Sequence, residues 1–260
     1  MKFVSKLLIV LILITVSIVS ARSAEAKMET ALTPYFWLSG IDGDVTIKGI
    51  SSSVEAGFSD IVENIDFALM FHLEMRKGDI AFYFDPSFIN SSQDAKAGPI
   101  NAELETKMQI IEFGALYTLH KKPIGKSDGR FLTFDMYGGF RYTFLQVDLD
   151  VSTEVVDVAA DVSRDDDWFD PLIGLSMGVD VSKTVKFIFR GDIGGFGFIN
   201  ASDFAWKILT GFKVDLSQRA LLFAGYQVLD IDYDKGIGTN ETFVYDMKTS
   251  GPVLGLGIWF

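Results

Sequence analysis

The feature that most constrains the fold of this chain is a strict alternation of side-chain character. In residues 67–76 every odd position holds a large apolar side chain, and the even positions include His72, Glu74 and Arg76. Successive side chains of a β-strand point to opposite faces, so this period of two predicts a strand that separates two different environments. A transmembrane β-barrel provides them, with lipid outside and a polar lumen inside. The same pattern recurs in residues 132–144, 173–180, 185–194 and 203–213.

Weaker alternation predicts five further strands, in residues 30–48, 79–90, 101–119, 220–233 and 242–260. Ten is an even number, as in single-chain bacterial barrels whose two termini lie in the periplasm. We therefore predict an all-β fold, a transmembrane antiparallel up-and-down β-barrel of about ten strands, with eight or twelve as alternatives. Strand-like runs in residues 50–58 and 154–162 keep these alternatives open. Polar residues change parity within 101–119, which predicts a β-bulge near Ile110 and Ile111.

The predicted connections alternate between short and long, as outer-membrane barrels require. Asp60 could cap one helical turn that ends at Glu63. We expect the periplasmic turns at residues 76–79, 120–130, 181–184 and 216–219. We expect the extracellular loops at residues 49–64, 91–101, 150–167, 196–202 and 234–242. Seven aromatic residues are expected to form the two interfacial girdles, with a carbohydrate-binding platform as the alternative: Tyr35, Trp37, Trp168, Trp206, Tyr226, Tyr233 and Trp259.

The N-terminus predicts export. Lys2 and Lys6 precede an apolar run over residues 7–19, which is shorter than the roughly 20 residues of a membrane-spanning helix. Ala24-Glu25-Ala26 fits a signal-peptidase site. We therefore predict a secretory signal peptide in residues 1–26, cleaved near Ala26, and one outer-membrane β-barrel domain in residues 27–260, located in the cell outer membrane.

Composition excludes several classes of function. The chain has no cysteine, which excludes a disulfide framework and a thiolate nucleophile. The whole chain has 23 basic and 35 acidic residues, and the predicted signal peptide holds three basic residues and one acidic residue. Its removal leaves 20 basic and 34 acidic residues, a net charge of −14. This acidity disfavours nucleic acid as a partner. The expected partners are outer-membrane lipid and lipopolysaccharide, and no cofactor is expected.

The last strand ends in a terminal aromatic residue preceded by alternating apolar positions. This arrangement resembles the C-terminal signal that the bacterial barrel assembly machinery reads, so that machinery is an expected partner. The residues that carry the signal are Leu254, Leu256, Ile258 and Phe260.

Several segments resemble a widespread family of largely uncharacterised Gram-negative outer-membrane β-barrel proteins. The resemblance spans nearly the whole mature chain and implies the barrel fold and the outer membrane, but no substrate or activity. The chain resembles the small OmpA-type barrels more distantly. Unlike them, it has no expected peptidoglycan-binding domain after the last strand. The segments are residues 34–43 (PYFWLSGIDG), 58–61 (FSDI), 167–174 (DWFDPLIG), 190–197 (RGDIGGFG) and the terminal Phe260.

The predicted lumen carries charges of both signs. Charges taken out of bulk water need partners, so a structural network that occludes the lumen is the favoured interpretation. A narrow path for ions or small solutes, lined by the same residues, is the alternative. The residues are His72, Glu74, Asp135, Arg141, Asp170, Asp180, Lys186, Arg190, Asp192 and Lys207.

Two short motifs invite functional interpretations that we do not favour. Arg190-Gly-Asp192 matches a cell-adhesion tripeptide, but alternation points both charged residues into the barrel. There we expect Arg190 to pair with Asp192, Asp180 or Asp135. His72 and Glu74 could act as a base and its orienting group, yet no nucleophile motif accompanies them. We expect structural hydrogen bonding and no enzymatic activity.

Residues 148–170 form the most acidic stretch of the chain, with Arg164 as the one basic residue. We expect a solvated acidic loop outside the cell. Capture of Ca²⁺ or Mg²⁺ by Asp165, Asp166 and Asp167 is the sharper hypothesis, since divalent cations bind carboxylate oxygens and bridge them to lipopolysaccharide phosphates.

Overall fold

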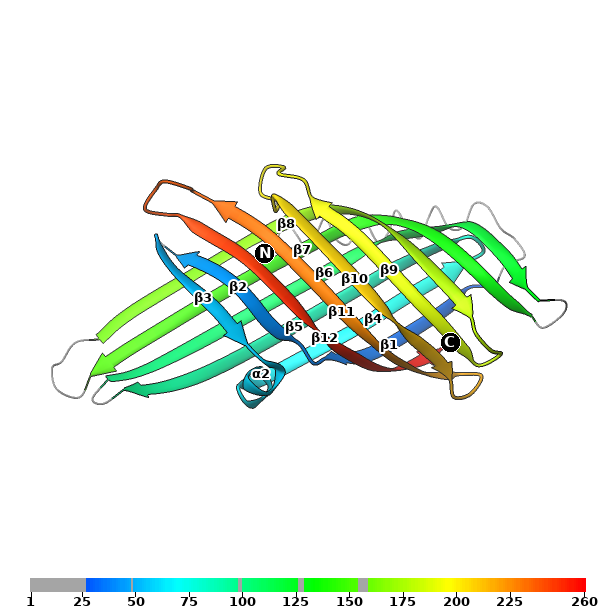
Figure 1. Cartoon of the computed structure of the whole chain (residues 1–260), viewed down its shortest axis with the longest axis horizontal. Coiled ribbons are helices and arrows are strands. Elements are labelled where there is room, and N and C mark those ends of the chain that lie inside the picture. Colours follow the sequence, from blue (N-terminus) through cyan, green and yellow to red (C-terminus); the bar gives the residue numbers. More distant parts are fainter. Residues whose placement is uncertain (1–26, 48, 98–99, 126–128, 154–158) are drawn as a thin grey trace.

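The computed structural model describes residues 27–260 except residue 48 and residues 98–99, 126–128 and 154–158, so the predicted signal peptide lies outside the described residues. The described part is one antiparallel sheet with a short helix, α2 (Phe58–Glu63) (Figure 1). Its strands are β1 (Glu29–Trp37), β2 (Gly40–Ile47), β3 (Ile50–Ala56), β4 (Ile65–Lys77), β5 (Ile80–Ala97), β6 (Ile100–Ile124), β7 (Arg130–Thr153), β8 (Ala159–Asp180), β9 (Val185–Gly195), β10 (Phe204–Asp215), β11 (Ala220–Lys235) and β12 (Phe243–Trp259).

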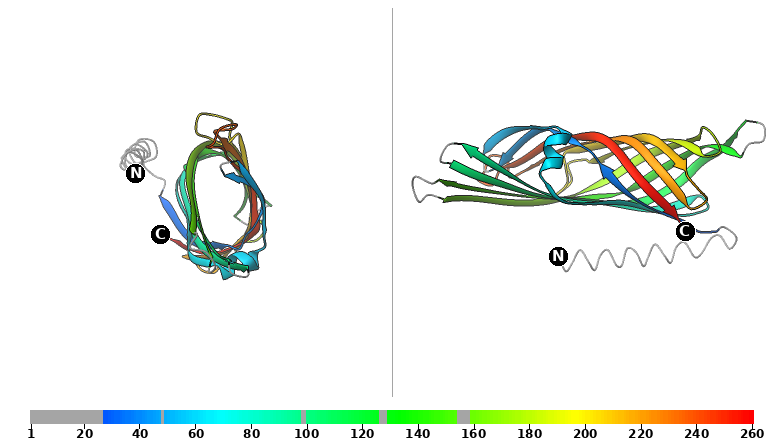
Figure 2. Two further views of the ribbon diagram at one scale, coloured as in Figure 1. Left: turned by 90° about the vertical axis from the view of Figure 1, so that its left-hand side faces the viewer. Right: turned by 90° about the horizontal axis from the view of Figure 1, so that it is seen from below.

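Ten of these strands close into a barrel. The order runs from β1 to β4 and then along the chain to β12, and β12 pairs back with β1. The end-on view shows the resulting oval ring (Figure 2). The two remaining strands, β2 and β3, extend the sheet from the first half of β12. The predicted fold class is therefore confirmed, with ten wall strands and two additional ones.

Residues 30–48, predicted as one strand, form β1 and β2 with a break between them. β1 pairs with the last part of β12, and β2 pairs with the first part. The ladder between β1 and β4 ends where Pro34 faces Phe71, and proline has no backbone N–H to donate. Beyond this point the chain separates from β4 and continues along β12 as β2. It then reverses direction as β3, which pairs with β2. One of the two open strand-like runs, residues 50–58, is thus an added strand.

The ten wall strands range from 9 residues in β1 to 25 residues in β6. β9 and β10 have 11 and 12 residues, close to the length that crosses a membrane, whereas β6, β7 and β8 have 25, 24 and 22. Residues 91–101 and 150–167, predicted as loops, are therefore mostly strand, because hairpin pairing satisfies their backbone groups beyond the membrane. We call the end with the turns at 78–79, 181–184 and 216–219, where β6 also ends and β7 begins, the turn end, and the opposite end the loop end.

The predicted bulge at Ile110 and Ile111 is wrong. Both residues pair in unbroken register with β5 and with β7, and the irregularity in the β6–β7 pairing lies at residue 119. Ile110 and Glu112 are both buried inside, while Glu103 and Glu105 are exposed outside. Parity is thus constant in β6 from residue 103 to residue 118. What changes is the outer face, which is apolar near the turn end and polar near the loop end.

A belt of exposed apolar side chains surrounds the barrel nearer the turn end. It includes Phe134, Met136, Ile173 and Leu175. The predicted C-terminal residues belong to it, since Leu254, Leu256, Ile258 and Phe260 are 47–71% exposed on one face of the last strand and its end. Near the loop end the same outer face carries charged residues of β11 and β12, Asp230, Asp232, Asp234, Asp246 and Lys248.

Helical structure is minor among the described residues, and no helix there has the length and apolar character needed to cross a membrane. α2 confirms the short helix expected from Asp60, whose carboxylate accepts a hydrogen bond from the N–H of Gly57 at 3.0 Å. The helix lies beside the β2–β3 hairpin, between the end of β3 and the start of β4 (Figure 1).

Candidate functional site inside the barrel

The interior has three zones between the turn end and the loop end. A cavity of about 670 Å³, here called the chamber, opens among turn residues such as Gly78, Asp79 and Ser182. An ionic network of Glu112, Arg141, Asp192 and Lys207 lies deeper in the barrel. Beyond it, buried apolar side chains fill the loop-end half. We call this group the apolar cap: Trp168, Leu229, Ile231, Tyr233, Phe243, Tyr245 and Met247.

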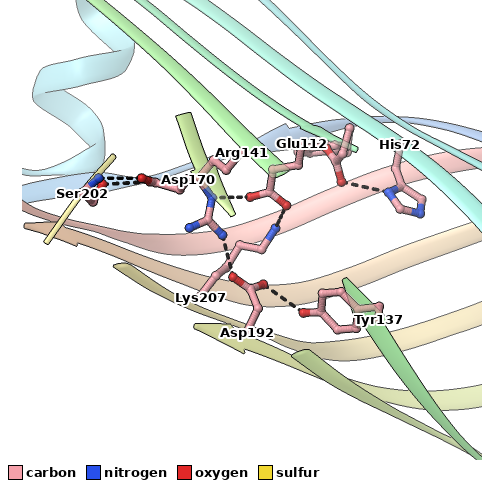
Figure 3. Close-up of polar contacts among 10 residues, drawn as sticks. His72, Glu112, Tyr137, Arg141, Asp170, Asp192, Ser202 and Lys207 are labelled. Atoms are coloured by element: carbon pink, nitrogen blue, oxygen red, sulfur yellow. Dashed lines mark hydrogen bonds and ion pairs between the residues drawn. The ribbon is translucent and has the colours of Figure 1, made fainter. Parts of the chain in front are cut away.

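The ionic network joins four strands around Arg141 (Figure 3). The guanidinium of Arg141 donates to Glu112 at 2.8 Å and to Asp192 at 2.7 Å. The second oxygen of Glu112 accepts a hydrogen bond from Lys207, and Asp192 also accepts one from Tyr137 at 2.9 Å. Arg141 is wholly inaccessible to solvent. Each charge in this layer is therefore neutralised by a partner from another strand, as burial demands.

A second buried contact ties the loop end to the same layer. Asp170 is fully buried next to Arg141 in the β7–β8 register. Its carboxylate accepts hydrogen bonds from the backbone N–H of Ser202 at 2.7 Å and from the hydroxyl of Ser202 at 2.8 Å (Figure 3). The connection between β9 and β10 is thereby fixed to the wall of the barrel.

Arg190 has a different environment. Its guanidinium stacks between two rings, 4.4 Å from the centroid of Tyr83 and 4.2 Å from that of Tyr137. The predicted pairing with Asp192, Asp180 or Asp135 is wrong, because Asp192 is taken by Arg141, Asp180 by Lys186 and Asp135 by Arg76. Aromatic faces attract cations, so the two tyrosines replace a carboxylate partner in part.

His72 lies at the side of the chamber between two carboxylates. Its Nδ1 is 2.8 Å from Asp85, and its Nε2 is 3.7 Å from Glu74. Asp85 also accepts a hydrogen bond from the hydroxyl of Tyr35 at 2.7 Å. Glu74 in turn contacts Arg76 at 3.2 Å. Both ring nitrogens thus face acceptors, an arrangement that orients the ring and offers no nucleophile.

The structure places the residues predicted for the lumen as follows. Asp135, Arg141, Asp170, Arg190, Asp192 and Lys207 are buried, and His72, Glu74, Asp180 and Lys186 are partly buried around the chamber. They form separate groups and not one continuous row, because apolar and aromatic side chains lie between them. Whether they line a conducting path stays a prediction.

Sequence reasoning missed residues that complete these groups: Tyr83, Asp85, Glu112, Tyr137 and Lys213. Glu112 shares the polar parity of Gly114 and Thr118, so alternation pointed it inward with or without the bulge. Asp85 and Lys213 stood on the inward parity of strands that were recognised. Tyr137 stood on the inward parity of the recognised strand in residues 132–144, whereas Tyr83 gave no signal, because a ring on a strand suits either face.

Five of the seven aromatic residues predicted for the girdles face the interior instead. Trp37, Trp168 and Tyr233 are buried, and Tyr35 binds Asp85. The rings of Trp168 and Tyr233 stack at 4.3 Å, forming the centre of the apolar cap. Trp259 lines the chamber. Trp206 and Tyr226 remain on the outer-facing parity of their strands, consistent with an interfacial position.

The acidic stretch 148–170 is mainly the outer part of the β7–β8 hairpin, and residues 154–158 lie outside the described residues. Alternation separates Asp166 from its neighbours: it is buried and bound by Arg164 at 2.6 Å and Lys235 at 2.7 Å, while Asp165 and Asp167 are exposed. The three carboxylates hypothesised to capture a cation therefore do not converge. Within the described part of the chain, no group of three His, Asp or Glu side chains has the geometry of a metal site.

Comparison with known proteins identifies the architecture. No protein-family model matches the chain, and no curated protein matches it. Among solved structures, the outer membrane protease OmpT from Escherichia coli is 7% identical, with a TM-score of 0.53 over 92% of this chain and 99% of that one. The translocator domain of autotransporter NalP from Neisseria meningitidis is 12% identical, with a TM-score of 0.41 over 92% and 90%. Ail, the attachment invasion locus protein of Yersinia pestis, is 10% identical, with a TM-score of 0.36 over 91% and 99%. At these identities, the similarity to OmpT concerns the fold alone.

Proposed function

We propose that the mature chain is an integral outer-membrane β-barrel with a structural or interaction role, closed to conduction and without enzymatic activity. The observation that supports this proposal most directly is that the apolar cap and the ionic network fill the barrel on the loop-end side of the chamber. The belt of apolar side chains and the fold shared with OmpT support the membrane location. The C-terminal residues 254–260 are then the segment that the assembly machinery reads.

The proposed orientation puts the turn end in the periplasm. Short connections and both ends of the barrel chain gather there, as they do in outer-membrane barrels. The long hairpins β5–β6 and β7–β8 then project from the cell. Their outer faces carry carboxylates such as Asp148 and Asp165, and divalent cations would link these to lipopolysaccharide. This surface is where we place the interaction role.

The runner-up is a narrow channel for ions or small solutes. The chamber supports it only in part, because its lining comes from the turn-end half and the middle of the barrel. A complete path would need Arg141 to leave two carboxylates and the stacked rings of Trp168 and Tyr233 to separate.

An enzyme is the third class. OmpT is named a protease, but the groups around His72 support an orienting network and not a nucleophile and its base. Unchanged lipid A and phospholipid profiles on overexpression are expected, and a profile that changes with the native chain but not with His72→Ala would contradict the proposal.

The deciding experiment is single-channel recording of the refolded mature protein in a planar bilayer. Slower migration after heating, compared with the unheated sample, would first show that the barrel is folded. We expect a folded protein without discrete openings. Regular conductance steps from the native protein, altered in size or ion selectivity by Arg141→Ala, would establish the channel instead.

A further inference from the structure

Among the described residues that line the chamber, four basic side chains form no ion pair within 4.0 Å: Lys121 and Lys183 are exposed, whereas Arg190 is buried and Lys213 is partly buried. The neighbours of Arg190 and Lys213 are already matched. The pairs are His72 with Asp85 and Glu74, Arg76 with Glu74 and Asp135, Lys186 with Asp180, and Lys207 with Glu112.

Arg190 is the more deeply placed of the two. It is 9% exposed, and its Nε and Nη2 atoms are buried without a hydrogen-bond partner. The rings of Tyr83 and Tyr137 cover the faces of the guanidinium, and Tyr137 is also a hydrogen-bonding neighbour, but Nε and Nη2 stay without an acceptor. Nε and one terminal nitrogen form the edge that donates two parallel hydrogen bonds to a carboxylate or phosphate. The unmet bonding capacity of Arg190 is therefore of the kind that such an anion satisfies.

Lys213 adds a second positive charge on the same wall. It lies opposite Lys186 in the β9–β10 register, and Arg190 lies opposite Leu209. Residues 209 and 213 share one face of β10 and are separated by about 13 Å of strand. Glu74 is the carboxylate that acts most strongly on Lys213, but it is engaged by His72 and Arg76. The wall formed by β9 and β10 is thus locally positive in a chain that is acidic overall.

We propose that the chamber is a binding site for a small anion that carries a carboxylate or phosphate group, held by Arg190 and Lys213. The ligand enters and leaves at the turn end, because the ionic network and the apolar cap close the other side. The carboxylates at the mouth, Asp79 and Asp215, are exposed, so water and salt screen them far more than they screen the buried Arg190.

Isothermal titration calorimetry on the refolded mature protein in detergent micelles tests this site, with succinate and inorganic phosphate as separate probes. We expect saturable binding at one site by at least one probe, weakened as potassium chloride is raised. Lys213→Met and Arg190→Met should each lower the affinity at least tenfold. Lys248→Met, an exposed lysine on the outer face near the loop end, should leave the affinity unchanged.

Two results would overturn the proposal: no saturable heat from either probe with folded native protein, or equal affinity in native, Lys213→Met and Arg190→Met proteins. Heat-modifiable migration establishes folding before each titration. If Arg190→Met does not fold, Lys213→Met decides the question alone. Binding of one probe only would identify the anionic group. Conductance does not enter this test, so its outcome is independent of whether the barrel is closed.

Discussion

Arg141 is fully buried, and both of its charged contacts are to carboxylates that are themselves buried. Removing one member of such a group leaves an unpaired charge inside the barrel, which costs about 3–5 kcal/mol. Arg141→Met is therefore expected to lower the free energy of unfolding by that amount, measured with denaturant on the refolded protein in detergent. A loss below about 1 kcal/mol would contradict the buried network.

Lys186→Met is the matched control for this prediction. Lys186 is half-exposed and makes a single ion pair with Asp180 at 3.2 Å, so its removal should cost no more than about 1 kcal/mol. Equal losses in the two variants would mean that burial does not distinguish the two pairs.

Asp232, on the outer face near the loop end, should make the stability of the folded protein depend on pH. Burial and the charge of Asp246, directly opposite in register, raise the pKa of the Asp232 carboxyl. The folded state then binds its proton more tightly than the unfolded state, so this group favours folding as the pH falls through the window between about 3.9 and the raised value. Asp232→Asn should be more stable than the native protein at pH 7 by a few tenths of a kcal/mol.

Thermal unfolding of both proteins from pH 7 to pH 4 measures this difference, which should shrink as the pH falls. Asp79→Asn, an exposed turn residue, serves as the control without such a neighbour. A difference that grows on acidification would show that repulsion between Asp232 and Asp246 is not its source.

Which side chains face inward could be predicted where the strands were recognised, but their partners could not. Parity in 173–180 points even positions inward and agrees with the predicted inward position of Asp170, and extending it to Trp168 would have found that residue too. Most of the apolar cap lies on β11 and β12, where the inward side chains are apolar, so the search for a charged lumen did not find it. Partner choice depends on register between distant strands, and for this reason Arg190 was paired with the wrong residues.

At the scale of elements, glycines admit the large side chains of neighbouring strands. Tyr137 faces Gly174 across the β7–β8 ladder, and a Cβ atom there would meet the Tyr137 ring at 2.4 Å and the Gly191 oxygen at 2.5 Å. Gly174→Ala should therefore displace Tyr137 and destabilise the barrel by about 1–3 kcal/mol. The unfolding temperature in detergent measures this effect.

Gly178→Ala is the control on the same strand and face, since its Cβ would meet Lys186 at an ordinary 3.5 Å. It should unfold close to the native temperature. Equal behaviour of the two alanine variants would contradict close packing of Tyr137 on Gly174.

Strand existence was predictable from alternation, and strand length was not. The period of two continues in the outer parts of β6 and β7, but its polarity is reversed because water lies outside and apolar side chains lie inside, so the pattern was not recognised as the same strand. The same change of surroundings imitated a bulge at Ile110. The break into β1 and β2 depends on Pro34 together with β12, whose register the sequence does not reveal.

For the whole molecule, the burial pattern reverses along the barrel axis: apolar outside and charged inside near the turn end, charged outside and apolar inside near the loop end. Because the chain has no cysteine, single substitutions can map this pattern on cells. Ser163→Cys should react with a membrane-impermeant maleimide on intact cells, and Ser182→Cys only after permeabilisation. Leu175→Cys, in the apolar belt, should react in neither state.

Labelling of Ser182→Cys but not Ser163→Cys on intact cells would reverse the proposed orientation. Labelling of all three would place the barrel outside a membrane altogether. Native chain, which offers no thiol, is the control for background reaction.

The seam of the barrel also governs how the protein can form. β12 holds β11 along one edge and both β1 and β2 along the other, and it ends at the last residue but one of the chain. The wall therefore cannot be sealed until β12 has been made, and sealing joins segments more than 200 residues apart, the kind of distant pairing that makes folding slow. Until that moment the sheet has two edge strands with unpaired backbone N–H and C=O groups. Whether the chain aggregates then depends on what covers these edges.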